Sequence, residues 1–154
     1  MTKSSFVYVT YIRTTADKLW QALIEPAFTR QYWLGAYQES EWKQGSSWKL
    51  LFEDGSVADA GEILEIDPHK RLVIRWRNEF LPEFKAEGYT RCTFEIEQTG
   101  ETTKLAIAHV AEADGPHKLI EQGVSNGWPM ILASLKSLLE TGKALSPEDL
   151  RPKG

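Results

Sequence analysis

The sequence is poor in cysteine, in long hydrophobic runs and in excess positive charge. Its 154 residues include one cysteine, Cys92, which excludes both an internal disulfide and a cysteine metal cluster. No apolar stretch approaches the length of a membrane span, and the opening MTKSSFVYVTYIR lacks the apolar core of a signal peptide. A net charge of −4 gives no bulk attraction to phosphate. We therefore expect a cytoplasmic protein without nucleic-acid binding or membrane insertion.

Tryptophan is the abundant residue that stands out. The chain has six tryptophans, and large rings are used either in cores or in the walls of ligand pockets. The hydrophobic fraction of 42% and the charged fraction of 26% are ordinary for a globular protein, and the length suits one domain. We expect a single domain over residues 1–144, followed by a polar, proline-marked tail over residues 145–154.

A helical stripe near the C-terminus is the strongest periodic signal. Apolar side chains recur there with the spacing of one helix face, at Trp128, Ile131, Leu132, Leu135, Leu138 and Leu139. Asn126 is placed to cap the helix, Pro129 falls in its first turn, and Gly142 is a natural stop. A helix this amphipathic must pack on a wide apolar surface.

The middle of the chain supplies such a surface, because its hydrophobic period changes to two between residues 36 and 111. The alternation runs through 48–52, 57–66, 72–76, 92–96 and 105–109, and Asp54-Gly55 predicts a tight turn. A strand over 6–13 and two short helices, the first capped by Thr14 or Thr15 and the second over 27–33, precede it. Clustered strands with segregated helices predict an α+β fold with an antiparallel meander of about six strands.

The polar face of this meander carries charges of both signs. Arg75, Arg77 and Arg91 alternate with apolar residues, and Glu95 and Glu97 share the same face. We favour cross-strand ion pairs in solvent, each worth about a few tenths of a kcal/mol, over a phosphate-binding patch.

Four segments in this order resemble one known family: ADKLWQALIEPAFTRQYWLG, ESEWKQGSSW, GEILEIDPHKRLVIRW and GWPMILASLKSLLETG. Over about residues 7–142 the chain is similar to the activator of heat-shock-protein-90 ATPase homologue family of the START-like (SRPBCC, Bet v 1-like) superfamily. The resemblance implies a helix-grip fold, in which a curved antiparallel sheet of six or seven strands wraps around the C-terminal helix. It also implies a cavity that binds a small apolar or amphipathic ligand of unknown identity, without a cofactor.

The candidate ligand-binding residues are those whose alternation or helical spacing turns them toward that cavity, with two more at its mouth. They are Trp33, Tyr37, Trp48, Phe52, Ile74, Trp76, Cys92, Phe94, Ile107, His109, Trp128, Ile131 and Leu132. For the aliphatic members plain core packing is the competing interpretation, and Cys92 is better read as a small buried hydrophobe than as a nucleophile.

Three polar positions bear on catalysis. His109 shares a face with Leu105 and Ile107, so it can orient a ligand carbonyl or act as an acid or base; a core histidine satisfied by one hydrogen bond is the favoured alternative. Asp59 and Glu62 lie in one strand whose facing the alternation leaves open, and a buried Glu62 is a plausible acid. No catalytic residue is assigned. We assign no metal site either, since neither His69 nor His117 has a second ligand at metal-site spacing.

The segment NEFLPEFKAEG, residues 78–88, places Phe80, Leu81 and Phe84 around Pro82. These side chains either fold over the rim of the core or form a lid or a protein-contact patch.

Two other functions stay open beside ligand binding. One is a cyclase- or dehydratase-like enzyme acting in the same cavity, and the other is a protein-interaction or co-chaperone-like module.

Overall fold

A curved sheet and the long helix that it encloses make up most of the molecule. The computed structural model describes residues 2–146 and 148, so most of the predicted tail lies outside the described residues. In chain order the elements are β1 (Lys3–Ile12), α1 (Ala16–Ile24), α2 (Pro26–Tyr32), β2 (Tyr37–Ser40), β3 (Ser47–Leu51), β4 (Val57–Asp67), β5 (Arg71–Asn78), α3 (Pro82–Lys85), β6 (Thr90–Thr99), β7 (Thr102–Asp114), the π-helix η1 (Leu119–Val124) and α4 (Ser125–Thr141).

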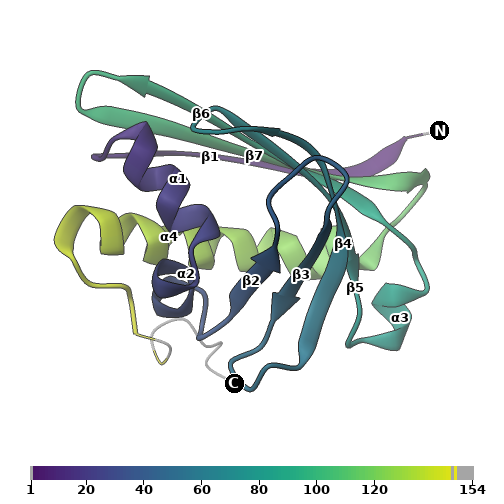
Figure 1. Ribbon diagram of the computed structural model, residues 1–154. Helices are drawn as coiled ribbons and strands as arrows, with labels where there is room; N and C mark the ends of the chain where they lie inside the picture. Colours follow the sequence, from purple (N-terminus) through teal and green to yellow (C-terminus); the bar gives the residue numbers. More distant parts are fainter. Residues whose placement is uncertain (1, 147, 149–154) are drawn as a thin grey trace.

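Within the described residues the strands form one seven-stranded sheet in the order β1-β7-β6-β5-β4-β3-β2, and every neighbouring pair is antiparallel. The sheet curls over α4, and α1 and α2 lie beside that helix at the end of the molecule away from α3 (Figure 1). The predicted α+β helix-grip fold is confirmed.

Helix α4 buries the predicted stripe. Trp128, Leu132, Leu135 and Leu138 are each at most 8% exposed, and Gly142 ends the helix in the left-handed conformation with φ of 87°. Glycine reaches that conformation without the steric cost that a Cβ would impose.

The predicted start of this helix is wrong. The chain is already helical at Leu119, because η1 runs directly into α4, and Pro129 lies inside the helix. Asn126 does not cap it; its Nδ2 donates instead to the Gln122 carbonyl at 2.7 Å, and the Ser125 hydroxyl donates to the Glu121 carbonyl at 2.6 Å. The π-turn leaves carbonyl groups of this segment to side-chain donors, which no hydrophobic period reveals.

The two short helices form as predicted, with Thr15 as the cap. Its hydroxyl accepts the Lys18 amide at 3.2 Å, which satisfies one of the free N–H groups of the first turn of α1. Helix α2 starts at Pro26, where a missing N–H costs nothing. It ends at Tyr32, and Trp33, the C-cap residue, places its side chain on the inner side of the sheet.

A β-bulge determines which side chains of β4 point toward the inner face of the sheet. The pairing of β4 with β5 shifts between Ile63 and Glu65, so residues before and after the shift alternate differently. Asp59 and Ile63 point inward and are 6% and 0% exposed, whereas Glu62 lies opposite Arg75 on the outer face and is half-buried. The possibility that Glu62 is a buried acid is therefore wrong.

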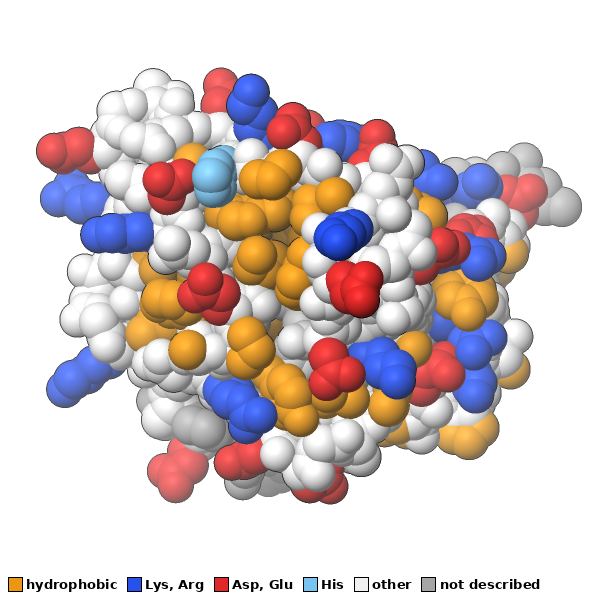
Figure 2. All heavy atoms as spheres, viewed as in Figure 1, with side chains coloured by type: hydrophobic (Ala, Val, Ile, Leu, Met, Phe, Trp, Pro, Cys, Tyr) orange, Lys and Arg blue, Asp and Glu red, His pale blue; other side chains and the backbone are white. Residues whose placement is uncertain are grey.

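The outer surface has mixed charge. Arg75 forms a two-pronged ion pair with Glu112, at 2.8 and 3.0 Å, and Arg77 pairs with Glu79 at 2.6 Å. On the face seen in Figure 2, acidic and basic side chains are interspersed around hydrophobic ones. Arg75 thus forms a cross-strand ion pair as expected, although with Glu112 rather than Glu95 or Glu97. Arg77 pairs instead with Glu79, two residues further along its own segment of the chain.

Candidate functional site

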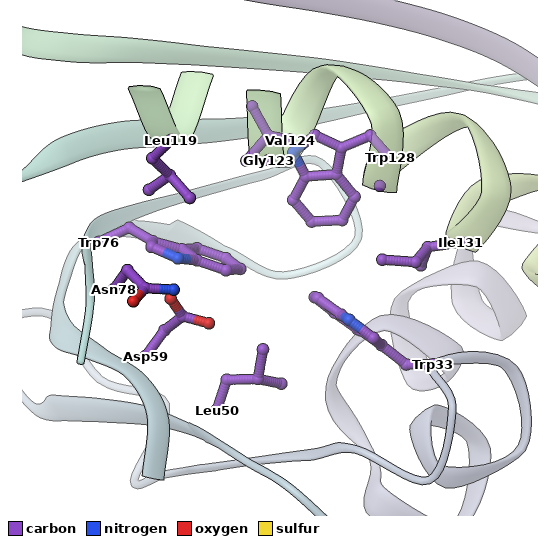
Figure 3. A pocket seen from close by; sticks show the side chains of 11 residues that line it. Trp33, Leu50, Asp59, Trp76, Asn78, Leu119, Gly123, Val124, Trp128 and Ile131 are labelled. Atoms are coloured by element: carbon purple, nitrogen blue, oxygen red, sulfur yellow. The ribbon is translucent and has the colours of Figure 1, made fainter. Parts of the chain in front are cut away.

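A pocket of about 120 Å³ lies between the inner side of the sheet and the η1–α4 segment (Figure 3). It is lined by residues of β3, β4, β5, η1 and α4 together with the residue that ends α2: Trp33, Leu50, Asp59, Trp76, Asn78, Leu119, Gly123, Val124, Gly127, Trp128 and Ile131. Gly123, Gly127 and Ile131 are the partly exposed members of this set, so the pocket reaches the surface along one side of η1 and α4.

Three indole rings form much of its wall. Trp33, Trp76 and Trp128 come from three different elements, and their ring centroids are 5.3 to 6.3 Å apart. The ring of Trp48 packs behind Trp76 at 4.4 Å, and its Nε1–H is held by Gln38 Oε1 at 3.0 Å. Because these rings fill much of the space inside the grip, the pocket is smaller than the roughly 300–1,000 Å³ typical of ligand sites.

Asp59 is the ionisable member of the pocket lining. Its side chain projects from β4 toward the space between the three rings (Figure 3), and the residue is 6% exposed. Asn78 lies directly opposite on β5 and is itself fixed, because its Oδ1 accepts the Leu81 amide at 2.9 Å. Asp59 Oδ1 has no hydrogen-bond partner among the described residues.

Burial raises the pKa of the Asp59 carboxyl to about 7, although hydrogen bonds from the Trp76 and Asn78 side chains lower it and the charge of Glu79 raises it further. At neutral pH the group therefore exchanges between the carboxylic acid and the carboxylate. An unpaired buried oxygen costs about 1–3 kcal/mol, which a ligand that donates a hydrogen bond would recover.

His109 lies beside the pocket but does not line it. Its Nδ1 accepts the Trp128 indole N–H at 3.2 Å, so the ring proton is on Nε2, which donates to Thr90 Oγ1 at 2.6 Å. The Thr90 hydroxyl donates in turn to the Trp76 carbonyl at 3.0 Å. Both ring nitrogens are thus occupied, and burial, with a contribution from His117, lowers the pKa of His109 to about 3. The favoured reading of a satisfied core histidine describes this arrangement.

Four of the predicted ligand-binding residues line the pocket: Trp33, Trp76, Trp128 and Ile131. Nine do not: Tyr37, Trp48, Phe52, Ile74, Cys92, Phe94, Ile107, His109 and Leu132. Most of the nine are core residues; Ile74, Cys92, Ile107 and Leu132 are at most 1% exposed. Tyr37 lies under the Arg30 guanidinium at 3.9 Å, outside the grip.

Phe52 is 38% exposed, because β3 ends at Leu51 after a register shift between Leu50 and Leu51. Alternation alone placed it inward. Ligand contact at all these positions stays a prediction.

The predicted ligand-binding residues include none of the η1 residues that line the pocket, and neither of its polar residues, Asp59 and Asn78. Leu119, Gly123 and Val124 line the pocket from a π-turn that hydrophobic periodicity did not indicate. Asp59 carried a signal, since it has the same parity as Ile63, but the bulge after Ile63 made the opposite facing equally plausible.

The other titratable residues that the structure describes do not assemble a second site. Among the described residues no three His, Cys, Asp or Glu side chains converge as metal ligands would. His69 pairs with Asp17 at 3.3 Å on the surface. His117 is 3% exposed, with its Nδ1 4.0 Å from Glu87 Oε1. None of the described helices is both long and apolar enough to cross a membrane.

The sequence matches one family model, described as Activator of Hsp90 ATPase homolog 1-like protein, over residues 13–140. No curated protein matches the chain significantly.

Solved structures of the same fold are similar over most of the chain. Protein MLL2253 from Mesorhizobium loti has a TM-score of 0.72 at 23% identity, covering 88% of this chain and 96% of its own. PFC0360w, described as an HSP90 activator from Plasmodium falciparum, has a TM-score of 0.71 at 21% identity, with the same coverages of 88% and 96%. CalU16 from Micromonospora echinospora has a TM-score of 0.71 at 22% identity, covering 95% of this chain and 79% of its own. At these identities the likeness establishes the fold.

Proposed function

Because the chain belongs to the family of Activator of Hsp90 ATPase homolog 1-like proteins, whose model matches residues 13–140, we propose that its helix grip binds a small, largely apolar molecule. The observation that carries the proposal is the pocket itself, in which three indole rings line the same space as a buried carboxyl oxygen of Asp59 that has no partner among the described residues.

The composition of the wall is that of a ligand site. Trp33, Trp76 and Trp128 offer large apolar surfaces, and Asp59 and Asn78 supply two polar groups that can orient a ligand. A ligand of about benzene size suits the space, because a dry apolar cavity of about 150 Å³ binds benzene. The site therefore accepts a small molecule, or one end of a longer one that leaves past Gly123 and Gly127.

The test is a titration with benzene-sized amphipathic compounds. Binding is monitored through the indole N–H signals of an NMR spectrum. Binding should shift the signals of Trp33, Trp76 and Trp128. Gly127→Leu should abolish the shifts by filling the pocket, since a Cβ at this position meets nothing nearer than Ile131 Cδ1 at 3.9 Å. Ala133→Leu is the matched control, because Ala133 is exposed on the same helix. Shifts that persist in Gly127→Leu would contradict the proposal.

An enzyme acting in this pocket is a second candidate, and Asp59 is the observation that favours it. A carboxyl group with a pKa near 7 is suited to general acid or base catalysis, as a cyclase or dehydratase would need. This reading predicts that a bound compound is converted to a product, and that Asp59→Asn binds the compound without converting it. A compound recovered unchanged after prolonged incubation would exclude catalysis on it.

A co-chaperone-like role is favoured by a different observation. Phe84 packs on the core, whereas Phe80 is 47% exposed and contacts the exposed Phe52 edge to face, with ring centroids 4.9 Å apart. This pair gives the 78–88 segment an apolar contact point beside α3. If the chain activates an Hsp90-type ATPase, as the family description suggests, Phe80→Ser should reduce that activation. Unchanged chaperone ATPase rates with saturating protein would rule it out.

A further inference from the structure

We infer that the ligand of this pocket carries a positively charged ammonium group, which binds between the indole rings and Asp59 Oδ1. The inference rests on the proposed function and names the chemical class of its ligand. Asp59 Oδ1 is an acceptor without a partner among the described residues, in a side chain that is more than nine-tenths buried and directed into the pocket (Figure 3). A buried acceptor of this kind is completed by a donor from outside the protein, which is a water molecule or a ligand.

The charge of the donor follows from what surrounds the carboxylate. The lining residues include no lysine, arginine or histidine, so no described side chain of the wall neutralises an ionised Asp59. A neutral hydroxyl would fill the hydrogen bond but leave the buried negative charge uncompensated. An ammonium group fills the bond and neutralises the charge together. An anionic ligand would be repelled by the same carboxylate.

The tryptophans support a cation in a second way. The negative face of an indole ring attracts a cation within about 6 Å of its centroid, and tryptophan is the strongest of the aromatic residues in this respect. Figure 3 shows Trp33, Trp76 and Trp128 on three sides of the same space as the Asp59 carboxyl. A site built from aromatic rings and one carboxylate discriminates an amine from an alcohol of equal shape.

Among residues 2–146 and 148, the other charged groups near the site do not supply a competing cation. Behind Asp59, at the end of β5, Glu79 is paired with Arg77 at 2.6 Å and with Lys85 of α3 at 3.5 Å. On the side of β3, Lys49 is exposed. On the side of η1, Glu121 is exposed. The Arg30 guanidinium of α2 is stacked on Tyr37.

Two histidines are also buried near this end of the grip. His109 stays neutral because burial lowers its pKa to about 3, and its two ring nitrogens are occupied by Trp128 and Thr90. His117 precedes η1 beside Glu87. Asp59→Asn leaves both histidines in place, so any pH dependence lost in that variant belongs to Asp59.

The experiment compares isobutylamine, isobutanol and isobutyrate, three probes of one shape that differ in charge. At pH 8 we expect the amine to bind at least about tenfold more tightly than the alcohol, and the acid not to bind, with the indole N–H signals as the readout. Between pH 8 and pH 5 the affinity for the amine should fall by about two orders of magnitude, because Asp59 takes up a proton while the amine, with a pKa near that of lysine, stays charged. Asp59→Asn should remove both the preference and the pH dependence.

Proton release provides a measurement on the unmodified protein, should Asp59→Asn not fold. Binding a cation favours the carboxylate, so amine binding at pH 7 should release up to about half a proton, detected by calorimetry in buffers of different ionisation enthalpy. Equal binding of amine and alcohol, without proton release, would overturn the ammonium assignment and leave small-molecule binding intact. Failure of all three probes and of the benzene-sized amphipathic compounds would overturn the proposed function itself.

Discussion

The indole N–H of Trp128 donates to Nδ1 of His109 across 3.2 Å, and this bond connects helix α4 to strand β7 inside the grip. It fixes the imidazole as the Nε2–H tautomer. The Nε2–H group therefore donates a hydrogen bond to Thr90 Oγ1 at 2.6 Å. On sequence alternation His109 is the most attractive catalytic candidate. In the structure both of its ring nitrogens are used to connect two walls of the pocket.

Replacing His109 should therefore cost stability more than function. His109→Ala leaves the Trp128 N–H and the Thr90 hydroxyl without their buried partner and opens a cavity, so we expect a loss of about 3 kcal/mol in the free energy of unfolding. Urea denaturation at pH 7 measures it. His69→Ala, at an exposed surface position, is the control and should change little. A loss below about 1 kcal/mol for His109→Ala would show that the bonds are weaker than their geometry indicates.

Gly61 should be among the least replaceable residues of the sheet. A Cβ built there lies 1.6 Å from the Arg75 carbonyl oxygen, and the two residues belong to the paired strands β4 and β5. Gly61→Ala must part β4 from β5 beside the pocket, and we expect more than about 3 kcal/mol of destabilisation or failure to fold. Expression yield and thermal melting test this. A melting temperature within a few degrees of the parent would mean that the strand shifts freely.

Gly127 should respond in the opposite way. A Cβ there makes one ordinary contact, with Ile131 Cδ1 at 3.9 Å, and the residue lies in a helix where glycine costs about 1 kcal/mol relative to alanine. Gly127→Ala is therefore expected to raise the free energy of unfolding by about 0.5–1 kcal/mol, measured by urea denaturation. The same change narrows the pocket, so affinity for a bound ligand should fall while stability rises. Unaltered affinity would place the ligand elsewhere.

The fold can be predicted from the sequence better than the site can. The stripe from Trp128 to Leu139, the Thr15 cap and the period-two strands follow from local rules, and the helix-grip fold follows from their order. The pocket depends on exceptions to those rules. The bulge after Ile63 decides which way Asp59 faces, and the π-turn at Leu119 decides which residues of the C-terminal segment reach the wall. Such irregularities arise from tertiary packing and produce no hydrophobic periodicity in the sequence.

Asp59 and His109, buried on either side of Trp76, should together make the free energy of unfolding nearly independent of pH. Each group alone would make it change strongly with pH. The folded-state pKa of Asp59 is about 7, above its ordinary 3.8, so its contribution is lost as pH rises from about 4 to 7. The pKa of His109 is about 3, below its ordinary 6.5, so its contribution is lost as pH falls from 6.5 toward 3. Each slope is about 1.4 kcal/mol per pH unit, with opposite sign, and they cancel between about pH 5 and pH 6.5. Below about pH 5 the carboxyl groups of Glu79, Glu112 and Glu140, whose pKa values are lowered by their partners, add a loss of stability of their own. Urea denaturation between about pH 5 and pH 6.5 should show a nearly constant free energy of unfolding for the parent, a rise with pH for Asp59→Asn and a fall with pH for His109→Gln. Parallel profiles for all three proteins would mean that neither group is shifted by burial as described.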